Sequence, residues 1–506
     1  MLVTTTKPLI LDQDALPPAE IDCAQTEWST LTSLRCSLEG VAKFGSDSVY
    51  CVESSRELLS HVTSALQAIE ALWYECGNVC QEDSFHRICA SADLLSGWLL
   101  NAVVPHVQKL ERGMTEGLFP TWNTLLTSTM SIARWNARWS WLRYKQPSIR
   151  FWTMASYLYE VAERWSKEQK NRSLVNDQGL SVSTEREYVR LLFGQWVAPA
   201  SLSPAAQFLM ETLLAGCMGN LRIASLADAG TQEQLDLCSG LIVLQTAHNI
   251  PRDRVRYISL SPLRDQVCTK LSDLIASGQV QADSASELFR TVVGRRTRYL
   301  VRMGRRTETM RMARACVGYQ RILGSVHGKP SAASHAAIFE SLAWSDCLVL
   351  DRSVDGCRLS LPKHADNALC VGALVGLNNV YDNEYCVGMV RWLRRTDADG
   401  WEAGVWMMRG QISVQRMRVD GGVWPSQNIS EVVITVVDAS KTSMHQVLAI
   451  LPKHSSRAIK KIDAETHNVQ YTVRLCLHPG ADFDLVILDQ MEPTIYKLSP
   501  AESLPH

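Results

Sequence analysis

The sequence predicts a multidomain α + β protein with an N-terminal all-α helical domain, then an antiparallel β-barrel, then a C-terminal β-rich segment. Three observations lead to this prediction. Apolar residues recur at helical spacing before about residue 250, short apolar runs separated by turn residues follow after about residue 340, and the chain has 506 residues. That length exceeds one ordinary hydrophobic core, so two to four domains are expected. A hydrophobic content of 46% and a charged content of 20% exclude the disordered and fibrous classes.

The first half of the chain has the spacing of helices. Residues 1–20 are polar and rich in proline and are expected to form a tail, and residues 21–250 are expected to form the helical domain. Two stretches have apolar residues at steps of three and four, which places them on one helix face. These faces are Leu59, Val62, Leu66, Ile69 and Trp73, and then Leu99, Val103, Val107 and Leu110. A further helical stretch, residues 251–296, is interpreted as a connector.

The pattern of apolar residues changes after the connector. Residues 297–410 contain apolar runs of strand length, separated by polar turn clusters at 382–384 and 397–400, which is typical of a small antiparallel barrel. Its first strand is expected at about residues 313–323. Residues 411–506 continue in the same way and are expected to form a C-terminal β-rich segment, either a second barrel or a sheet packed on the first.

An arginine-rich segment, which we call the arginine arm, precedes the barrel. Residues 291–330 hold nine arginines and one lysine against the single acid Glu308, in a chain whose formal net charge is −1. One interpretation of this asymmetry is a phosphate-binding segment. The alternatives are a solvated helix face or linker, or a patch that binds nucleic acid or anionic lipid.

A polar turn with the spacing Asp-x-Ser-x-x-Gly lies downstream of the arm, between two apolar runs. Asp351, Ser353 and Gly356 occupy its fixed positions. An ordinary turn stabilised by the Asp or Ser side chain explains this pattern locally. A carboxylate, a hydroxyl and a glycine next to a cationic arm also fit a site for a nucleotide.

Residues 297–410 resemble a PilZ domain, the bacterial receptor module for cyclic di-GMP. The resemblance rests on an Arg-x-x-x-Arg in the arm, the turn from Asp351 to Gly356, and the strand pair at 387–392 and 403–406. It implies an antiparallel β-barrel whose arm and turn bind the messenger together. It also implies a role in the change from motile to sessile life, through motility and biofilm formation.

The resemblance implies a set of ligand-binding residues. Arg302 and Arg306 would contact phosphate and guanine, because arginine pairs bidentately with both. Asp351 and Ser353 would contact a guanine edge or a phosphate, and Gly356 would give a tight turn with positive φ. The spacing is also satisfied by Arg298 with Arg302, and Arg305 lies between Arg302 and Arg306, so Arg298 and Arg305 are further candidates.

The chain departs from the family pattern between the arm and the turn. The interval from Arg306 to Asp351 is 45 residues, longer than usual for the family, and residues 324–339 are interpreted as an insertion. A displaced arm would leave a barrel that no longer binds nucleotide.

The favoured hypothesis is a non-catalytic cyclic-di-GMP receptor that passes its signal to the helical domain and, through it, to a protein partner. One alternative is a degenerate PilZ scaffold that acts by protein–protein interaction without nucleotide. Another is a nucleic-acid binder that uses the arm, although nucleic acid is not the expected partner. No nucleophile elbow or catalytic triad is recognisable, so no enzyme is expected.

Several further patterns are interpreted as structural. Cys76, Cys80, His86 and Cys89 have the residue types of a zinc site but not its usual spacing, so buried cysteines are expected and no metal or cofactor. Trp135, Arg138, Trp139 and Leu142 share one helix face, which favours packing over stacking on single-stranded nucleic acid. No apolar run reaches the length of a membrane span and no secretory signal is recognisable, so a cytoplasmic protein with reduced cysteines is expected.

Overall fold

The computed structural model describes most of the chain between residues 29 and 490. The described residues are 29–42, 44, 52–78, 84–112, 119–172, 179–197, 199–217, 223–225, 233–237, 239–243, 254–278, 282–297, 307–327, 344–353, 356–362, 369–379, 385–396, 400–408, 411–420, 430–437, 446–452, 461–464, 469–480 and 483–490. The chain divides into two compact units, Met1–Tyr299 and Leu300–His506.

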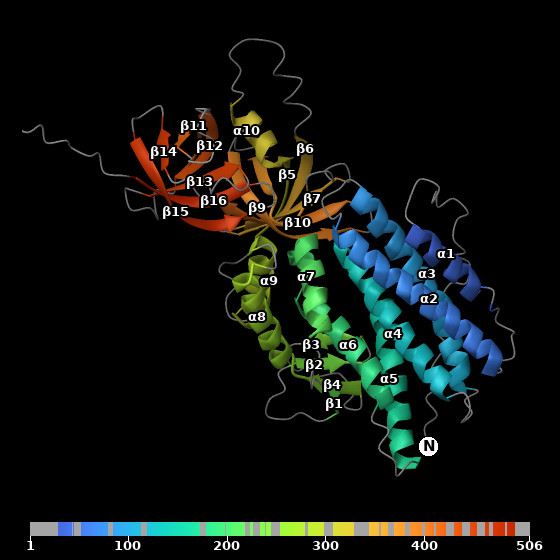
Figure 1. Ribbon diagram of the computed structural model, residues 1–506. Helices are drawn as coiled ribbons and strands as arrows, with labels where there is room; N and C mark the ends of the chain where they lie inside the picture. The colour runs from blue at the N-terminus through green and yellow to red at the C-terminus, as the bar shows by residue number, and fades with distance from the viewer. Residues whose placement is uncertain are drawn as a thin grey trace, which may run out of the picture. The chain divides into compact units, whose positions relative to one another are not determined.

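The first unit is built mainly from helices (Figure 1). They are α1 (Ser29–Ala42), α2 (Val52–Asn78), α3 (Ser84–Arg112), α4 (Phe119–Leu142), α5 (Ile149–Arg172), α6 (Gly179–Val197), α7 (Pro204–Ala215), α8 (Ser261–Ala276) and α9 (Ala282–Thr297). Helix α1 packs against α2 and α3, and α4 packs against α2, α3 and α6. Helix α7 begins at a regular cap, where the Ser203 side chain accepts a hydrogen bond from the Ala206 amide.

The two apolar faces expected from the sequence lie in the core of this unit. Val62, Ile69 and Trp73 on α2 are buried, and Leu59 and Leu66 are half-buried against the same core. All four expected residues of α3 are buried, and α3 continues on both sides of Pro105. By length and composition the stretch Arg87–Arg112 of α3 is the one described helix that could cross a membrane, and half of its most apolar window is buried inside the structure.

The expectation of an all-α domain is wrong in one region, because the first unit contains a small antiparallel sheet. Its strands are β1 (Ile223–Ala224), β2 (Glu233–Asp236), β3 (Leu241–Val243) and β4 (Val255–Ile258), in the order β1-β4-β2-β3. Strands of two to four residues are too short for an alternating pattern to show in the sequence. Helices α8 and α9, expected as a separate connector, contribute Leu263, Val267 and Leu288 to the same core as α1–α7.

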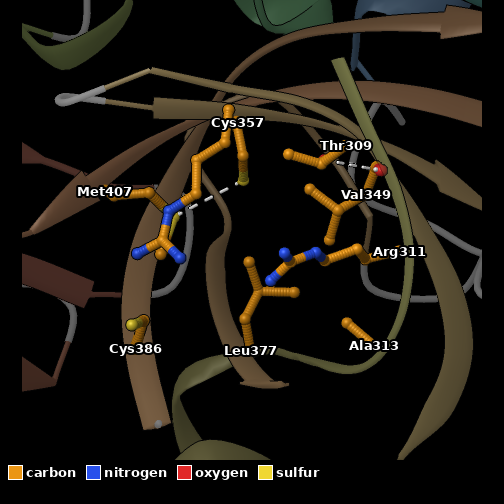
Figure 2. A pocket seen from close by; sticks show the side chains of 9 residues that line it. Thr309, Arg311, Ala313, Val349, Cys357, Leu377, Cys386 and Met407 are labelled. Atoms are coloured by element: carbon orange, nitrogen blue, oxygen red, sulfur yellow. Dashed lines mark hydrogen bonds between the residues drawn. The ribbon is translucent and has the colours of Figure 1, made fainter. Parts of the chain in front are cut away.

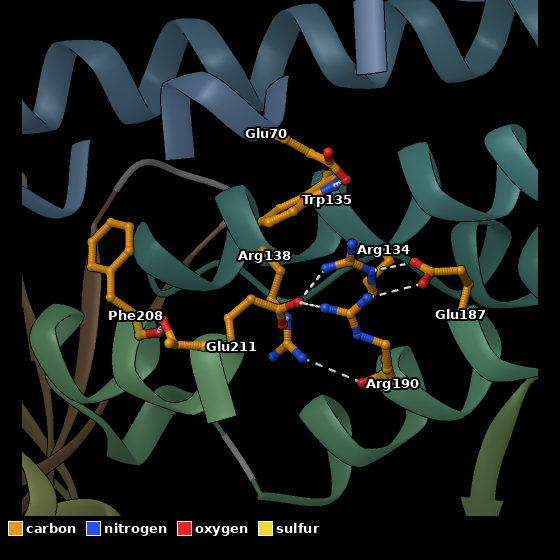
Figure 3. Close-up of polar contacts among 9 residues, drawn as sticks. Glu70, Arg134, Trp135, Arg138, Glu187, Arg190, Phe208 and Glu211 are labelled. Atoms are coloured by element: carbon orange, nitrogen blue, oxygen red, sulfur yellow. Dashed lines mark hydrogen bonds and ion pairs between the residues drawn. The ribbon is translucent and has the colours of Figure 1, made fainter. Parts of the chain in front are cut away.

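A cluster of buried charges joins α4, α6 and α7 (Figure 3). Arg134 and Arg138 of α4 are 1% exposed, and both form ion pairs with Glu211 of α7, which is 3% exposed. Arg134 and Arg190 share a second carboxylate, Glu187 of α6. Burial alone would raise the pKa of Glu211, but the three guanidinium groups lower it to about 2. Burial lowers the pKa of Arg138 to about 10.

The Trp-rich segment of α4 is packed inside the helical unit, as expected from its spacing. Trp135, Arg138, Trp139 and Leu142 are all at most 2% exposed. The Trp73 ring of α2 lies 5.2 Å from the Trp135 ring and 5.1 Å from the Trp139 ring. Because these rings are covered, stacking on nucleic acid is excluded for this face in the folded chain.

The second unit begins with a closed antiparallel barrel, which confirms the expected barrel. Its strands are β5 (Thr307–Val317), β6 (Ser345–Ser353), β7 (Gly356–Leu361), β8 (Leu374–Asn379), β9 (Tyr385–Arg395) and β10 (Trp401–Met408), in the closed order β10-β7-β6-β5-β8-β9. The first strand starts six residues earlier than expected, and residues expected at its end form α10 (Tyr319–His327) instead. Tyr319 and Ile322, buried on α10, are three apart, and that spacing fits a helix.

The β-rich segment at the end of the chain is a second closed antiparallel barrel. Its strands are β11 (Gln411–Asp420), β12 (Ser430–Val437), β13 (Gln446–Pro452), β14 (Lys461–Ala464), β15 (Val469–Pro479) and β16 (Phe483–Gln490), in the closed order β11-β12-β13-β16-β15-β14. The two barrels share an apolar cluster: Leu374, Val387, Met389 and Met408 of the first pack with Ile450, Phe483 and Leu485 of the second.

Candidate functional site

The Asp-x-Ser-x-x-Gly segment is the turn of an antiparallel hairpin. Asp351 and Ser353 end β6, Gly356 begins β7, and Ser353 and Gly356 are register partners. The Ser353 hydroxyl donates a hydrogen bond to the Gly356 carbonyl oxygen at 3.1 Å, which closes the turn. Ser353 therefore stabilises the turn, which is the local explanation of the motif. Its hydroxyl oxygen keeps lone pairs with which it can accept a further hydrogen bond.

Gly356 is required here by a close contact. The positive φ expected for it stays a prediction. A Cβ at this position would lie 2.7 Å from the Val405 carbonyl oxygen of β10, the strand that pairs with β7. A side chain would therefore collide with backbone that is fixed by the ladder.

Asp351 forms a buried ion pair within the hairpin. The residue is 5% exposed, and its Oδ2 lies 2.8 Å from Nε of Arg358, its register partner on β7. Glu402 on β10 follows at 4.0 Å from the Arg358 guanidinium, and Arg394 on β9 lies 2.7 Å from Glu402. These four charges run across neighbouring strands on the outer surface of the barrel, because Cys357, Leu359 and Leu361 alternate with Arg358 and are the buried residues of β7.

Sequence reasoning missed Arg358 as a residue of the site. The signal was present, because β7 reads Gly-Cys-Arg-Leu-Ser-Leu and alternates between buried and half-buried positions. In that alternation Arg358 points to the outer surface of the barrel, where Asp351 lies, and not into the core. An arginine beside the turn carboxylate can pair with it in the absence of ligand and can bind guanine or phosphate in its presence.

The part of the arginine arm before Thr307 leads into β5, the strand that pairs with β6 of this hairpin, and the rest of the arm includes β5 and α10. The side chains of Arg298, Arg302, Arg305 and Arg306 lie outside the described residues. Strand β5 begins at Thr307, the residue after Arg306, and pairs with β6 so that Thr307 faces Arg352 and Glu308 faces Asp351. The chain therefore enters the barrel beside the turn, within one residue of Arg306.

The extra residues between the arm and the turn join the strands at the opposite end. β5 runs away from the turn to Val317, and β6 returns from Ser345. Ten residue steps along β5 span about 33 Å. Because residues 318–344 are added at that far end, the long interval does not displace the start of β5 from the turn.

The start of β5 has an unusual backbone. The pairing of β5 with β6 shifts between Glu308 and Arg311, and Met310 within this bulge has a φ of 41°. A positive φ in a residue other than glycine costs about 1–3 kcal/mol and is maintained only by its surroundings. Met310 and Met312 are also exposed, at 65% and 47%. The site thus has a strained segment and apolar surface next to its charges.

The candidate metal site in the helical unit is not assembled from described side chains. Cys76 and Cys89 are buried, and their Sγ atoms lie 3.8 Å apart. The side chains of Cys80 and His86 lie outside the described residues. Burial raises the pKa of the Cys89 thiol, which favours the protonated form over the thiolate that a metal needs.

The match that comparison with known families gives falls on the helical unit. Residues 57–228 match the family described as the cyclic-di-GMP receptor FimW, N-terminal domain. The match runs from within α2 to just beyond β1 and covers about a third of the chain. It supports a cyclic-di-GMP receptor. No curated protein matches the chain.

The family match and the barrel are separate parts of the molecule. The matched residues lie in the unit Met1–Tyr299, whereas the turn and the start of β5 lie in the unit Leu300–His506. The match therefore does not use the residues from which the sequence first suggested cyclic di-GMP.

Proposed function

We propose that this protein is a non-catalytic receptor for cyclic di-GMP. The match of residues 57–228 to the N-terminal domain of a cyclic-di-GMP receptor carries the proposal. The barrel supports it independently through its arginine arm and its Asp-x-Ser-x-x-Gly hairpin. We further propose that the chain acts in the cytoplasm, with the helical unit contacting a protein partner in the control of motility and biofilm formation.

We place the messenger on the outer surface of the first barrel, at the β6–β7 turn. The pairing of Thr307 with Arg352 supports this position, because it puts the residue after Arg306 next to the turn. Arg302 and Arg306 then bind phosphate and guanine groups, with Arg298 and Arg305 as the further candidates. Asp351 accepts hydrogen bonds from the N1–H and N2 amino groups of a guanine, and Ser353 accepts or donates at the same edge.

The ion pair within the hairpin gives this mechanism an exchange step. Asp351 is held by Arg358 at 2.8 Å, so a guanine has to compete with Arg358 for the carboxylate. Once released, the guanidinium can pair with a phosphate or with guanine O6 and N7. Contact between the arm and the ligand would couple the barrel to the chain that leads to the helical unit, which is how the signal would reach that unit.

Calorimetric titration of the full-length chain with cyclic di-GMP tests the function. GTP and linear di-GMP are the controls, because they offer the same bases and phosphates without the cyclic arrangement. Saturable heat with cyclic di-GMP alone is expected, and two molecules per chain would indicate that the messenger binds as a stacked pair. Absence of heat and of any shift in melting temperature would reject the receptor and favour the scaffold.

Two substitutions test the position of the site. Arg306→Ala and Asp351→Ala should each weaken binding at least tenfold, which corresponds to about 1.4 kcal/mol. Arg321→Ala on α10 and Asp346→Ala at the far end of β6 remove the same charges from exposed positions of the same barrel and should leave the affinity unchanged. If the affinity survives both test substitutions, the messenger binds elsewhere.

A further inference from the structure

A pocket opens inside the first barrel, on the other side of the hairpin from the proposed messenger site (Figure 2). Its cavity volume is about 70 Å³, and every strand of the barrel contributes to its wall. The lining residues are Thr309, Arg311, Ala313, Val349, Arg352, Cys357, Leu377, Cys386 and Met407. Mouths of β-barrels are a recurrent place for small-ligand sites.

The pocket combines two guanidinium groups with an otherwise mostly apolar wall. Arg311 comes from β5 and Arg352 from β6, and the other seven described residues that line the pocket carry no charge. Figure 2 shows Arg311 extending towards the space between Leu377 and Val349. Both arginines are also accessible to solvent, so an ion can reach them from outside the barrel. A cationic pocket with low-dielectric walls strengthens the attraction for an anion.

An irregularity in the backbone of the β6–β7 hairpin places Asp351 on the outer side of the barrel and Arg352 on the inner side. The pairing of β6 with β7 passes from Val349–Leu359 to Asp351–Arg358, so β6 has one extra residue there. Because strand side chains alternate, this extra residue moves Asp351 to the outer side with Arg358 and turns Arg352 to the inner side with Cys357. Burial raises the pKa of the Cys357 thiol to about 12, and the Arg352 charge opposes that rise, which fits a guanidinium on the inner side.

The neighbouring strand has an irregularity at the same level. The pairing of β5 with β6 shifts between Glu308 and Arg311, and the residue with positive φ, Met310, immediately precedes Arg311. Bulges are frequent at barrel rims and beside functional sites, where they redirect a side chain. Two adjacent strands thus interrupt their ladders where each places an arginine in the pocket.

We propose that this pocket binds a phosphate-class oxyanion between Arg311 and Arg352. Both guanidinium groups offer paired N–H donors that match the oxygens of a tetrahedral anion. A water needs about 10–15 Å³ of such volume, so the cavity accommodates a phosphate group but not a nucleoside. The inference goes beyond the proposed receptor function and does not depend on it, because the pocket lies on the inner side of the barrel wall.

The test uses Cys386, which lines the pocket, as the reporter. The full-length chain is alkylated with iodoacetamide, with inorganic phosphate or with chloride of equal ionic strength, and the modification of Cys386 is followed by peptide mass spectrometry. Phosphate should slow alkylation of Cys386. It should not slow alkylation of the exposed Cys476 in the second barrel, which is the internal control.

Variants assign the protection to the two arginines. Arg311→Leu and Arg352→Leu should each abolish it, whereas Arg321→Leu, which removes a charge from an exposed position of α10, should retain it. Arg352→Lys keeps the charge without the paired donors and should retain part of it, which guards against a Leu variant that fails to fold. Protection that persists in both folded Leu variants would overturn the proposal.

A parallel series with GMP and cyclic di-GMP identifies the source of the oxyanion. Protection by inorganic phosphate supports a site for the free ion. Protection only by a nucleotide, lost in Arg352→Leu, supports the same site with the nucleotide's phosphate as the ligand. If neither phosphate nor nucleotide slows alkylation of Cys386, the pocket is not an oxyanion site, whatever the outcome of the calorimetric titration.

Discussion

Glu211 is the carboxylate on which three buried guanidinium groups converge. It pairs with Arg134, Arg138 and Arg190, and the Arg138 Nε lies 2.8 Å from Oε2. Removing one partner of a buried ion pair leaves a charge that is neither hydrated nor compensated. Glu211→Gln should therefore lower the free energy of unfolding of the helical unit by about 3–5 kcal/mol.

Urea unfolding followed by helical circular dichroism measures this effect in the full-length chain. Glu39→Gln is the matched control, because Glu39 is 58% exposed and pairs with Arg35 one turn away on α1. An exposed pair of this kind contributes about 0–1 kcal/mol. Similar effects of the two substitutions would show that the buried cluster is not needed for stability.

His106 gives the helical unit a pH-dependent stability. It is 6% exposed on α3, and burial, with a smaller effect of Lys109, lowers its pKa from 6.5 to about 4. Between these values the unfolded chain binds more protons than the folded one. Stability is therefore fully present above pH 6.5 and falls as the pH is lowered towards 4, by up to about 3 kcal/mol.

The comparison of wild type with His106→Gln isolates this contribution. Thermal midpoints measured across that pH range should fall more steeply for the wild-type chain than for the variant. Equal slopes would assign the acid sensitivity to other groups.

At the scale of the element, strands β5 and β6 have the proposed messenger site at one end and their own connection at the other. The turn and the start of β5 lie at one end, and residues 318–344 connect the strands at the other. Replacing residues 328–343 by a short Gly-Ser linker should thus leave the affinity for cyclic di-GMP unchanged, because the register beside Arg306 is retained. A large loss of affinity in a folded variant would mean that this connection takes part in binding.

Strands with long apolar runs were predictable, and short or irregular elements were not. The barrel was recognised from runs such as β9 and β10, whose eleven and eight residues bury much of their length. The sheet β1–β4 was missed because its strands have two to four residues. The start of β5 was missed because residues 307–312 are mostly exposed and give no apolar signal.

The candidate site was predictable in its motif but not in its contacts. Asp351, Ser353 and Gly356 lie together on one hairpin, as their spacing indicated. The pairing of Asp351 with Arg358, and the turn of Arg352 into the barrel, depend on one extra residue in β6. Such a bulge is set by the register of three strands, and no local pattern in the sequence shows it.

At the scale of the whole molecule, the two lines of evidence for cyclic di-GMP fall in different units. The receptor-family match covers residues 57–228, and the arm and hairpin lie between residues 298 and 361. We expect a fragment of residues 298–506 to retain binding, because it contains all the proposed ligand-binding residues. We expect a fragment of residues 1–297 to lack it.

Calorimetry of the two fragments, each first shown to be folded by circular dichroism, makes this comparison. Binding by the helical fragment alone would move the messenger site into the region that matches the receptor family. The barrel would then need another role, for which the oxyanion pocket offers a starting point.

The apolar cluster between the barrels has a consequence for the order of events during synthesis. Met389 and Met408 of the first barrel belong to one buried cluster with Phe483 and Leu485, which leave the ribosome about 75 to 95 residues later. Because synthesis proceeds at roughly 5–20 residues per second, this apolar surface of the first barrel stays exposed for several seconds. During that interval the nascent chain can bind chaperones. A chain that ended soon after residue 408 would keep this apolar surface exposed permanently.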